Sequence, residues 1–122
     1  MKRILVVDDD AAIRKVARAM LESRGFAVAE AEDGPGGLAA CSNGARPDAI
    51  LLDIDMPGLD GLSVLRELRA QPAMASVPIV MFTTYNALPL IEKALELGAA
   101  EYIMKPFDVE ILESKLSLAG IT

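Results

Sequence analysis

The sequence has 122 residues, which suits one domain with a single core, and hydrophobic residues make up 52% of it, enough to fill that core. The formal net charge of −6 argues against direct binding to nucleic acid or anionic lipid, so proteins and small cations are the expected partners. The absence of histidine excludes His-based catalytic triads, histidine metal ligands and phosphohistidine within this chain.

The first predicted elements alternate between apolar strands and helices. Residues 3–7 form a run of aliphatic residues typical of a strand that is buried on both faces. Only four apolar residues precede three aspartates, too few for a signal peptide or a membrane span, so we expect a cytoplasmic protein without a membrane partner. A helix over 11–24, a strand over 27–31 and a helix over 34–43 follow, and the lone Cys41 is interpreted as a small buried residue.

The second half of the chain continues the same alternation. Its predicted elements are a strand over 48–52, a helix over 62–70, a strand over 77–82, a helix over 88–97, a strand over 101–104 and a helix over 108–119. Strands that alternate with helices imply a parallel sheet covered on both faces. Right-handed crossovers then favour a doubly wound α/β fold, flavodoxin-like, with five parallel strands in the order 2-1-3-4-5 and one domain over residues 1–122.

Polar residues follow the apolar strands at the edge where such a sheet binds its ligands. That edge is the one formed by the carboxyl ends of the strands, at the point where the strand order reverses. Asp8 and Asp9 follow the first strand, and Asp53 follows the third. Thr83 and Lys105 follow the fourth and fifth strands. We therefore expect these side chains to converge.

Crowded carboxylates at this edge need a compensating charge. Two unit charges about 4 Å apart repel by ~4 kcal/mol at an effective dielectric constant near 20. Mg²⁺ binds through one or two carboxylates with phosphate oxygens and water, which fits this edge. Asp10 is better explained as the N-cap of the following helix. Taken singly, Asp53 could also be a turn residue and Lys105 a solvated surface lysine.

An ordered set of motifs resembles the receiver domains of response regulators, which are CheY-like. The matching segments are residues 4–9 (ILVVDD), 51–58 (LLDIDMPG), 60–61 (DG), Thr83, Tyr102 and 105–107 (KPF). The resemblance covers essentially the whole chain.

The resemblance implies a phosphoacceptor site that depends on a divalent metal. Asp53 would accept the phosphoryl group. Asp9, Asp53 and the backbone carbonyl of Asp55 would bind Mg²⁺ or Mn²⁺, with support from Asp8. Lys105 would pair with the phosphoryl group, and the peptide bond that follows it would be cis.

The resemblance also implies a conformational switch formed by Thr83 and Tyr102. Thr83 would move toward the phosphoryl group and vacate space for Tyr102. The face that changes would comprise the fourth helix, fifth strand and fifth helix, with Leu90, Lys93 and Glu113 as members.

Three further residues are expected to tune access to the acyl phosphate. Asp55 and Tyr85 would flank the path of an attacking water and set the phosphate lifetime. Thr84 would restrict access to the site.

Two other functions remain open at this point. The pair Asp53 and Asp55 also resembles the nucleophile motif of haloacid-dehalogenase-like phosphatases, although it follows the third strand rather than the first. The chain could also be a receiver-like scaffold that is not phosphorylated. We expect a signalling domain rather than an enzyme, with intrinsic phosphotransfer and autodephosphorylation.

The expected partners follow from the same resemblance. They are a sensor histidine kinase or histidine phosphotransfer protein and a downstream target protein, with no nucleic acid and no membrane. We expect a stand-alone regulator of the chemotaxis type, because residues 81–84 and 101–108 resemble that group. Its output would be binding to the flagellar motor switch or service as a phosphate sink. The expected state is a monomer, with dimerisation on activation as the alternative.

Overall fold

Five parallel strands form the centre of the molecule in the computed structural model, which describes residues 1–42, 46–84 and 88–121. The strands are β1 (Arg3–Val7), β2 (Ala27–Ala31), β3 (Ala49–Asp53), β4 (Ile79–Thr83) and β5 (Glu101–Met104). Their order in the sheet is β2-β1-β3-β4-β5, and every neighbouring pair is parallel. The predicted fold class and strand order are confirmed.

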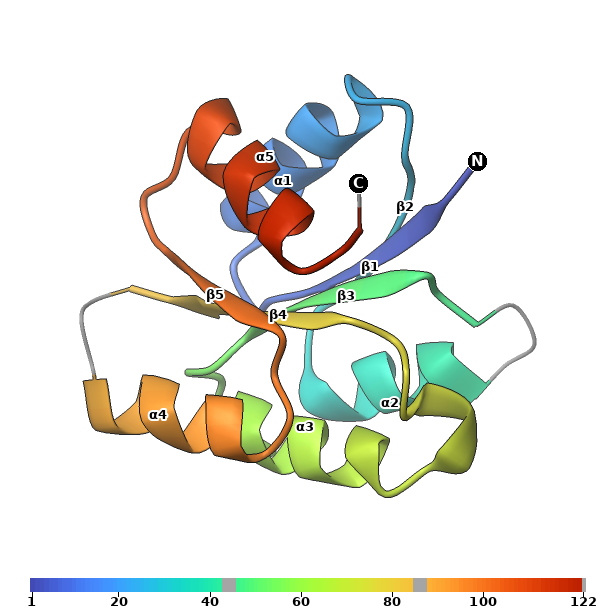
Figure 1. Ribbon diagram of the computed structural model, residues 1–122, viewed down its shortest axis with the longest axis vertical. Helices are drawn as coiled ribbons and strands as arrows, with labels where there is room; N and C mark the ends of the chain where they lie inside the picture. The colour runs from blue at the N-terminus through green and yellow to red at the C-terminus, as the bar shows by residue number, and fades with distance from the viewer. Residues whose placement is uncertain (43–45, 85–87, 122) are drawn as a thin grey trace.

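Helices cover both faces of this sheet (Figure 1). They are α1 (Ala11–Glu22), α2 (Gly34–Ser42), α3 (Gly61–Arg69), α4 (Leu88–Glu96) and α5 (Val109–Leu118). Helices α1 and α5 lie on one face, and α2, α3 and α4 lie on the other. None of the helices in the described ranges is long and apolar enough to cross a membrane.

Alternate residues of each strand supply two separate cores. Ile4 and Val6 of β1 are fully buried on the side of α1 and α5. Leu5 and Val7 point the other way and pack with residues such as Val64 of α3. Because both faces are covered, all five residues of β3 are buried, which explains the uninterrupted apolar runs in the sequence.

The ends of several elements differ from the predicted ones for local reasons. Helix α1 ends at Glu22, two residues early, because Gly25 adopts a positive φ of 88° and Phe26 turns its N–H back to the Leu21 carbonyl. A short 3₁₀ helix, η1 (Pro72–Met74), was not predicted and precedes β4. Cys41 is buried in α2, as predicted, and burial raises the pKa of its thiol.

Gly61 begins α3 where this helix packs against the end of β3. A Cβ atom at position 61 would lie 2.7 Å from the Cα atom of Ile54 and closer still to the backbone oxygen of Asp53. The N–H of Gly61 donates a 3.0 Å hydrogen bond to the carbonyl of Ile54. Only glycine allows this approach, which holds the segment after Asp53 against the helix.

Replacing Gly61 with alanine is expected to destabilise the fold by about 1–3 kcal/mol, because the new methyl group must displace backbone atoms. Urea unfolding of the wild-type chain and the variant measures this difference. Glu67→Ala, at an exposed position of the same helix, is the matched control. Equal midpoints for both variants would contradict the tight packing of Gly61.

Candidate functional site: an acidic cluster at the carboxyl edge of the sheet

The polar residues that follow the strands converge at one edge of the sheet, as predicted. Asp8 and Asp9 follow β1, Asp53 is the last residue of β3, and Thr83 is the last residue of β4. Lys105 follows β5 directly, and its backbone N–H donates to the Thr83 carbonyl at 2.7 Å. Asp8, Asp53 and Thr83 are the buried polar residues of the described chain, with exposures of 0%, 2% and 4%.

Three carboxylates share this edge. Asp8, Asp9 and Asp53 each place one carboxylate oxygen within 4.8 Å of the others. Burial, followed by repulsion from the Asp8 carboxylate, raises the pKa of Asp53 to about 7, although Lys105 acts in the opposite direction. A carboxyl group with such a pKa is ionised only in part at neutral pH. The positive charge of Lys105 is therefore not enough to keep the Asp53 carboxylate fully ionised.

Lys105 supplies one positive charge to the cluster. Its Nζ atom lies 2.6 Å from Oδ2 of Asp8 and 3.3 Å from Oδ1 of Asp53, and its side chain is 8% exposed. The interpretation of Lys105 as a solvated surface residue is therefore wrong. The peptide bond between Lys105 and Pro106 is cis, as predicted.

The donor set of the cluster fits a hard divalent cation. Three carboxylates are accompanied by one ammonium group, which contacts two of them, and the donors are oxygen atoms, the ligands that Mg²⁺ and Mn²⁺ prefer. Asp10 is not part of the cluster: its side chain accepts from the N–H of Ala12 at 2.9 Å and caps α1, as predicted. The N–H of Asp55 donates to Oδ1 of Asp53 at 3.3 Å, so the Asp55 backbone also borders the cluster.

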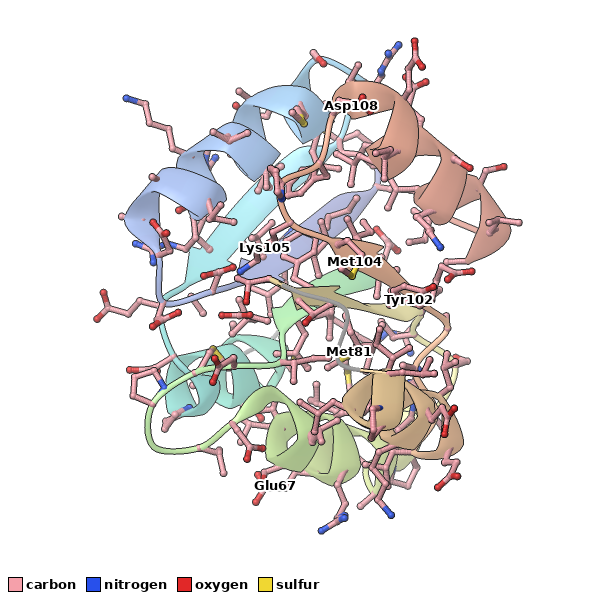
Figure 2. All side chains as sticks on the ribbon, turned by 90° about the vertical axis from the view of Figure 1, so that its left-hand side faces the viewer. Glu67, Met81, Tyr102, Met104, Lys105 and Asp108 are labelled. Atoms are coloured by element: carbon pink, nitrogen blue, oxygen red, sulfur yellow. The ribbon has the colours of Figure 1, made fainter. Side chains whose placement is uncertain are left out.

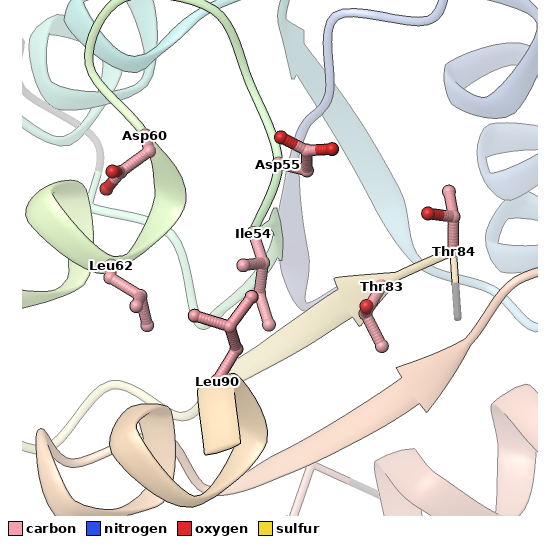
Figure 3. Close-up of a pocket in the computed structure, with 7 residues that line it drawn as sticks. All are labelled: Ile54, Asp55, Asp60, Leu62, Thr83, Thr84 and Leu90. Carbon is pink, nitrogen blue, oxygen red and sulfur yellow. The ribbon is translucent and has the colours of Figure 1, made fainter. Parts of the chain in front are cut away.

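A cavity of about 150 Å³ adjoins the cluster on the side of α3 and α4. Its lining residues, shown in Figure 3, are Ile54, Asp55, Asp60, Leu62, Thr83, Thr84 and Leu90. Thr83 borders this hollow at the end of β4, and the exposed Thr84 follows it. Tyr85, the other residue expected to tune the phosphate lifetime, lies outside the described residues.

Tyr102 lies on β5, half-buried and one strand away from Thr83. Figure 2 shows Tyr102 and Met104 on this strand and Lys105 just beyond its end. The Lys115 ammonium lies 4.3 Å from the centre of the Tyr102 ring and pairs with Glu101 at 3.0 Å. Helix α5 therefore contacts β5 through Lys115.

Glu113 of α5 contacts the chain just after α1. It forms an ion pair with Arg24, which follows α1. Its carboxylate is thus directed toward the segment that follows α1, and its place on the face that changes stays a prediction. Positions 113 and 115 lie about 200° apart on an α-helix, so their side chains leave α5 in nearly opposite directions.

The family match decides what kind of domain carries this site. The family described as the response regulator receiver domain matches residues 4–117. This chain belongs to the response regulator receiver domains. It is therefore a signalling domain of a two-component response regulator, and the phosphatase alternative has no support from the match.

Curated relatives of this receiver domain are longer proteins. Response regulator MprA of Mycobacterium sp. (strain KMS) is 41% identical over 114 residues, which cover 93% of this chain and 48% of that protein. DNA-binding response regulator MtrA of Mycobacterium tuberculosis (strain ATCC 25618 / H37Rv) is 42% identical over 115 residues, or 94% of this chain and 49% of that protein. The receiver domain spans about half the length of the curated relatives it matches.

A solved structure confirms the CheY-like fold. Chemotaxis response regulator CheY4 of Vibrio cholerae has a TM-score of 0.91 and 32% identity to this receiver domain, with 98% of both chains covered. The acidic cluster also fits the family, because receiver domains bind Mg²⁺ at an acidic pocket.

Two predictions about partners and pathway need correction. The expected absence of nucleic acid among the partners is wrong, because relatives that match more than nine-tenths of this receiver domain are named as DNA-binding regulators. The charge argument failed because a net charge of −6 describes only these 122 residues, whereas about half of each relative lies outside the match. The chemotaxis assignment is not supported either, since the curated relatives are MprA and MtrA.

Proposed function

We propose that this receiver domain accepts a phosphoryl group on Asp53 from a histidine kinase or a histidine phosphotransfer protein. The observation that carries the proposal is the position of Asp53, a residue only 2% exposed, whose carboxylate lies beside two other aspartates and within 3.3 Å of the Lys105 ammonium. Asp8, Asp9, Asp53 and the backbone carbonyl of Asp55 would hold Mg²⁺ or Mn²⁺.

The residues of the site have distinct tasks in this reaction. A carboxylate oxygen of Asp53 forms a bond to phosphorus while the bond from phosphorus to the donor's imidazole nitrogen breaks, and that nitrogen takes up a proton from water. Lys105 neutralises part of the charge on the phosphoryl oxygens. A divalent cation held by these residues would supply further positive charge, which would keep Asp53 ionised and stabilise the transferring group.

The proposed switch pairs Thr83 with Tyr102. In the sheet register, Thr83 is opposite Met104 and Tyr102 is opposite Met81, so the two residues lie on adjacent strands. A hydrogen bond to a charged group contributes about 1.5–3 kcal/mol. New hydrogen bonds from Thr83 and Lys105 to the phosphoryl group would together approach the roughly 5.5 kcal/mol that shifts a 1:99 equilibrium to 99:1. Movement of Thr83 would thus change the environment of Tyr102.

We infer that the output of this switch is control of a nucleic-acid target. The support is the match to MtrA, a DNA-binding response regulator, over 94% of this receiver domain. On this proposal, phosphorylation of Asp53 regulates DNA binding by the protein in which the domain works. A DNA-binding assay with and without phosphorylation tests this proposal. DNA binding that does not change on phosphorylation would favour the alternatives, which are binding to another protein or service as a phosphate sink.

Mass spectrometry of the intact chain tests phosphoryl acceptance. Incubation with acetyl phosphate and Mg²⁺ is expected to add the mass of one phosphoryl group to the wild type and to Asp48→Asn, but not to Asp53→Asn. Asp48 is the matched control because it is exposed and lies next to the opposite end of β3. Equal modification of Asp53→Asn, or none in the wild type, would contradict the proposal.

A further inference from the structure

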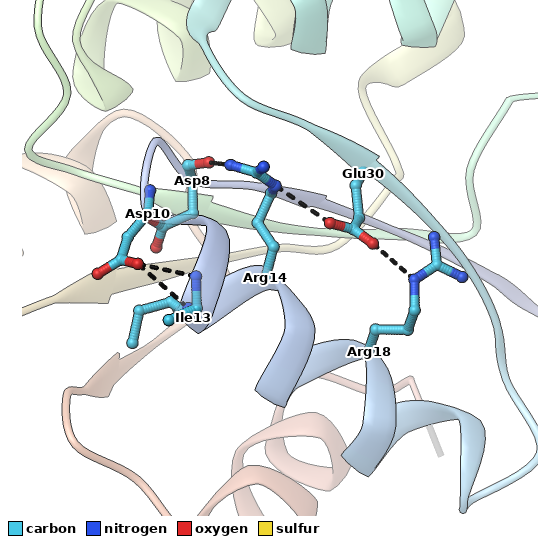
Figure 4. A network of polar contacts seen from close by, with 7 residues as sticks. Asp8, Asp10, Ile13, Arg14, Arg18 and Glu30 are labelled. Carbon is cyan, nitrogen blue, oxygen red and sulfur yellow. Dashed lines mark hydrogen bonds and ion pairs between the residues drawn. The ribbon is translucent and has the colours of Figure 1, made fainter.

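Arg14 of α1 reaches the acidic site through the protein backbone. Its Nη1 atom donates a hydrogen bond of 2.7 Å to the carbonyl oxygen of Asp8. Its Nε atom donates to Oε1 of Glu30 at 3.1 Å (Figure 4). The Arg14 side chain is only 15% exposed. Arg14 therefore joins α1 to the end of β1 and to β2.

Glu30 is positioned to fix the direction of Arg14. It is opposite Val6 in the register of β1 and β2. Its second carboxylate oxygen accepts from Nε of Arg18 at 2.6 Å, and Arg18 also pairs with Glu22 at 3.2 Å. Arg18 thus belongs to the same network (Figure 4) but donates no hydrogen bond to Asp8 within the described chain.

The Asp8 carbonyl lies just beyond the regular sheet. The paired residues of β1 and β2 end with Val7 and Ala31, and the N–H of Asp8 makes one more bond, 3.1 Å long, to the Ala31 carbonyl. The next group along the chain is the Asp8 carbonyl, which Arg14 binds. Because a peptide unit is planar, this bond fixes the orientation of the unit that joins Asp8 to Asp9.

Asp9 depends on that backbone unit for its position. Its side chain is exposed, and no hydrogen bond from another described residue holds its carboxylate. The Asp8 carboxylate, in contrast, is held by Lys105 at 2.6 Å and by the N–H of Asp10 at 2.9 Å. The orientation of the peptide between Asp8 and Asp9 therefore determines whether Asp9 points toward the other two carboxylates.

We propose that Arg14 is a positioning residue that orients the Asp8–Asp9 peptide for divalent-cation binding. This inference rests on the proposed function of the same site. Charge alone predicts the opposite effect, because removing a cation from the neighbourhood of a metal site strengthens metal binding. The sign of the change in Mg²⁺ affinity therefore distinguishes positioning from simple electrostatics.

Calorimetric titration of the whole chain with Mg²⁺ tests the proposal. Loss of an outer partner of a metal ligand weakens metal affinity by about tenfold or more, and this is the change expected for Arg14→Ala. Arg18→Ala is the matched control: it removes two ion pairs of the same network but is expected to change affinity by less than about twofold. In the metal-free protein, amide hydrogen exchange at Asp10, whose N–H donates to Oδ1 of Asp8, should be faster in Arg14→Ala only.

Arg14→Lys extends the test if the alanine variant does not fold. It keeps the charge but cannot donate to the Asp8 carbonyl and Glu30 with the same planar fork, so Mg²⁺ affinity should fall in this variant too. Unchanged or tighter Mg²⁺ binding by the Arg14 variants, or an equal loss in Arg18→Ala, would overturn this inference alone. A wild-type chain that does not bind Mg²⁺ would overturn the proposed function as well.

Discussion

Asp53→Asn is expected to become more stable than the wild type as the pH rises, in the absence of metal. Asp53 has a pKa of about 7 in the folded chain, raised from 3.8 mainly by burial. The folded chain binds the Asp53 proton more tightly than the unfolded chain does. The stability that this protonation contributes is therefore fully present below pH 3.8 and is lost as the pH rises to about 7. For a carboxyl group with a pKa of 3.8 in the unfolded chain and about 7 in the folded chain, ionisation lowers the free energy of unfolding by about 4 kcal/mol across that pH range.

Urea unfolding in EDTA at several pH values measures this effect. The difference in the free energy of unfolding between Asp53→Asn and the wild type should grow by roughly 2–3 kcal/mol between about pH 5 and pH 8. Glu67→Gln, which neutralises an exposed carboxylate on α3, should show no comparable growth. Parallel pH profiles for the wild type and Asp53→Asn would contradict the burial of a carboxylate with a raised pKa.

Lys105→Met is expected to cause the largest loss of metal-free stability among the site variants. Lys105 contacts the carboxylates of Asp8 and Asp53, and both are buried. Removal of one partner from a buried ion pair typically costs about 3–5 kcal/mol, because the remaining charge is left without compensation. The loss should be greater at about pH 8 than at pH 5, because protonation of Asp53 relieves the repulsion at low pH.

The same unfolding measurements test this prediction with Lys15→Met as the control, an exposed lysine on α1. Mg²⁺ at saturating concentration should restore part of the stability of Lys105→Met, because a ligand that binds only the folded state stabilises it by mass action. A Lys105→Met variant as stable as Lys15→Met in EDTA would show that the ammonium does not compensate the cluster.

The fold and the centre of the site could be predicted because strong local signals agreed with general rules of topology. Continuous apolar runs such as that of β3 indicated strands buried on both faces. The handedness of crossovers then gave the strand order, and the strand order gave the edge at which Asp8, Asp53 and Lys105 meet.

The contacts that helix side chains make with other elements could not be predicted. The role of Arg14 requires the register that places Glu30 opposite Val6, and sequence spacing alone does not give that register. An arginine one turn after the helix cap at Asp10 was the only available signal. Similarly, the contact of Lys115 with Glu101 and the ion pair of Glu113 with Arg24 join α5 to other elements, and the sequence did not predict either of them.

Partner prediction failed for a different reason. The net charge describes these 122 residues alone, whereas the curated relatives are about twice as long. It therefore cannot predict the partners of regions outside the match. No pattern within these 122 residues identified a nucleic-acid target.

Chemical mapping of the phosphorylated carboxyl group is the most direct test of the central claim. Borohydride reduces an acyl phosphate of aspartate to homoserine, and peptide mass spectrometry after treatment with acetyl phosphate locates the converted residue. We expect homoserine at position 53 alone, with its yield abolished by EDTA. Conversion at Asp8, Asp9 or Asp55 instead, or a yield at Asp53 that is indifferent to Mg²⁺, would contradict the account.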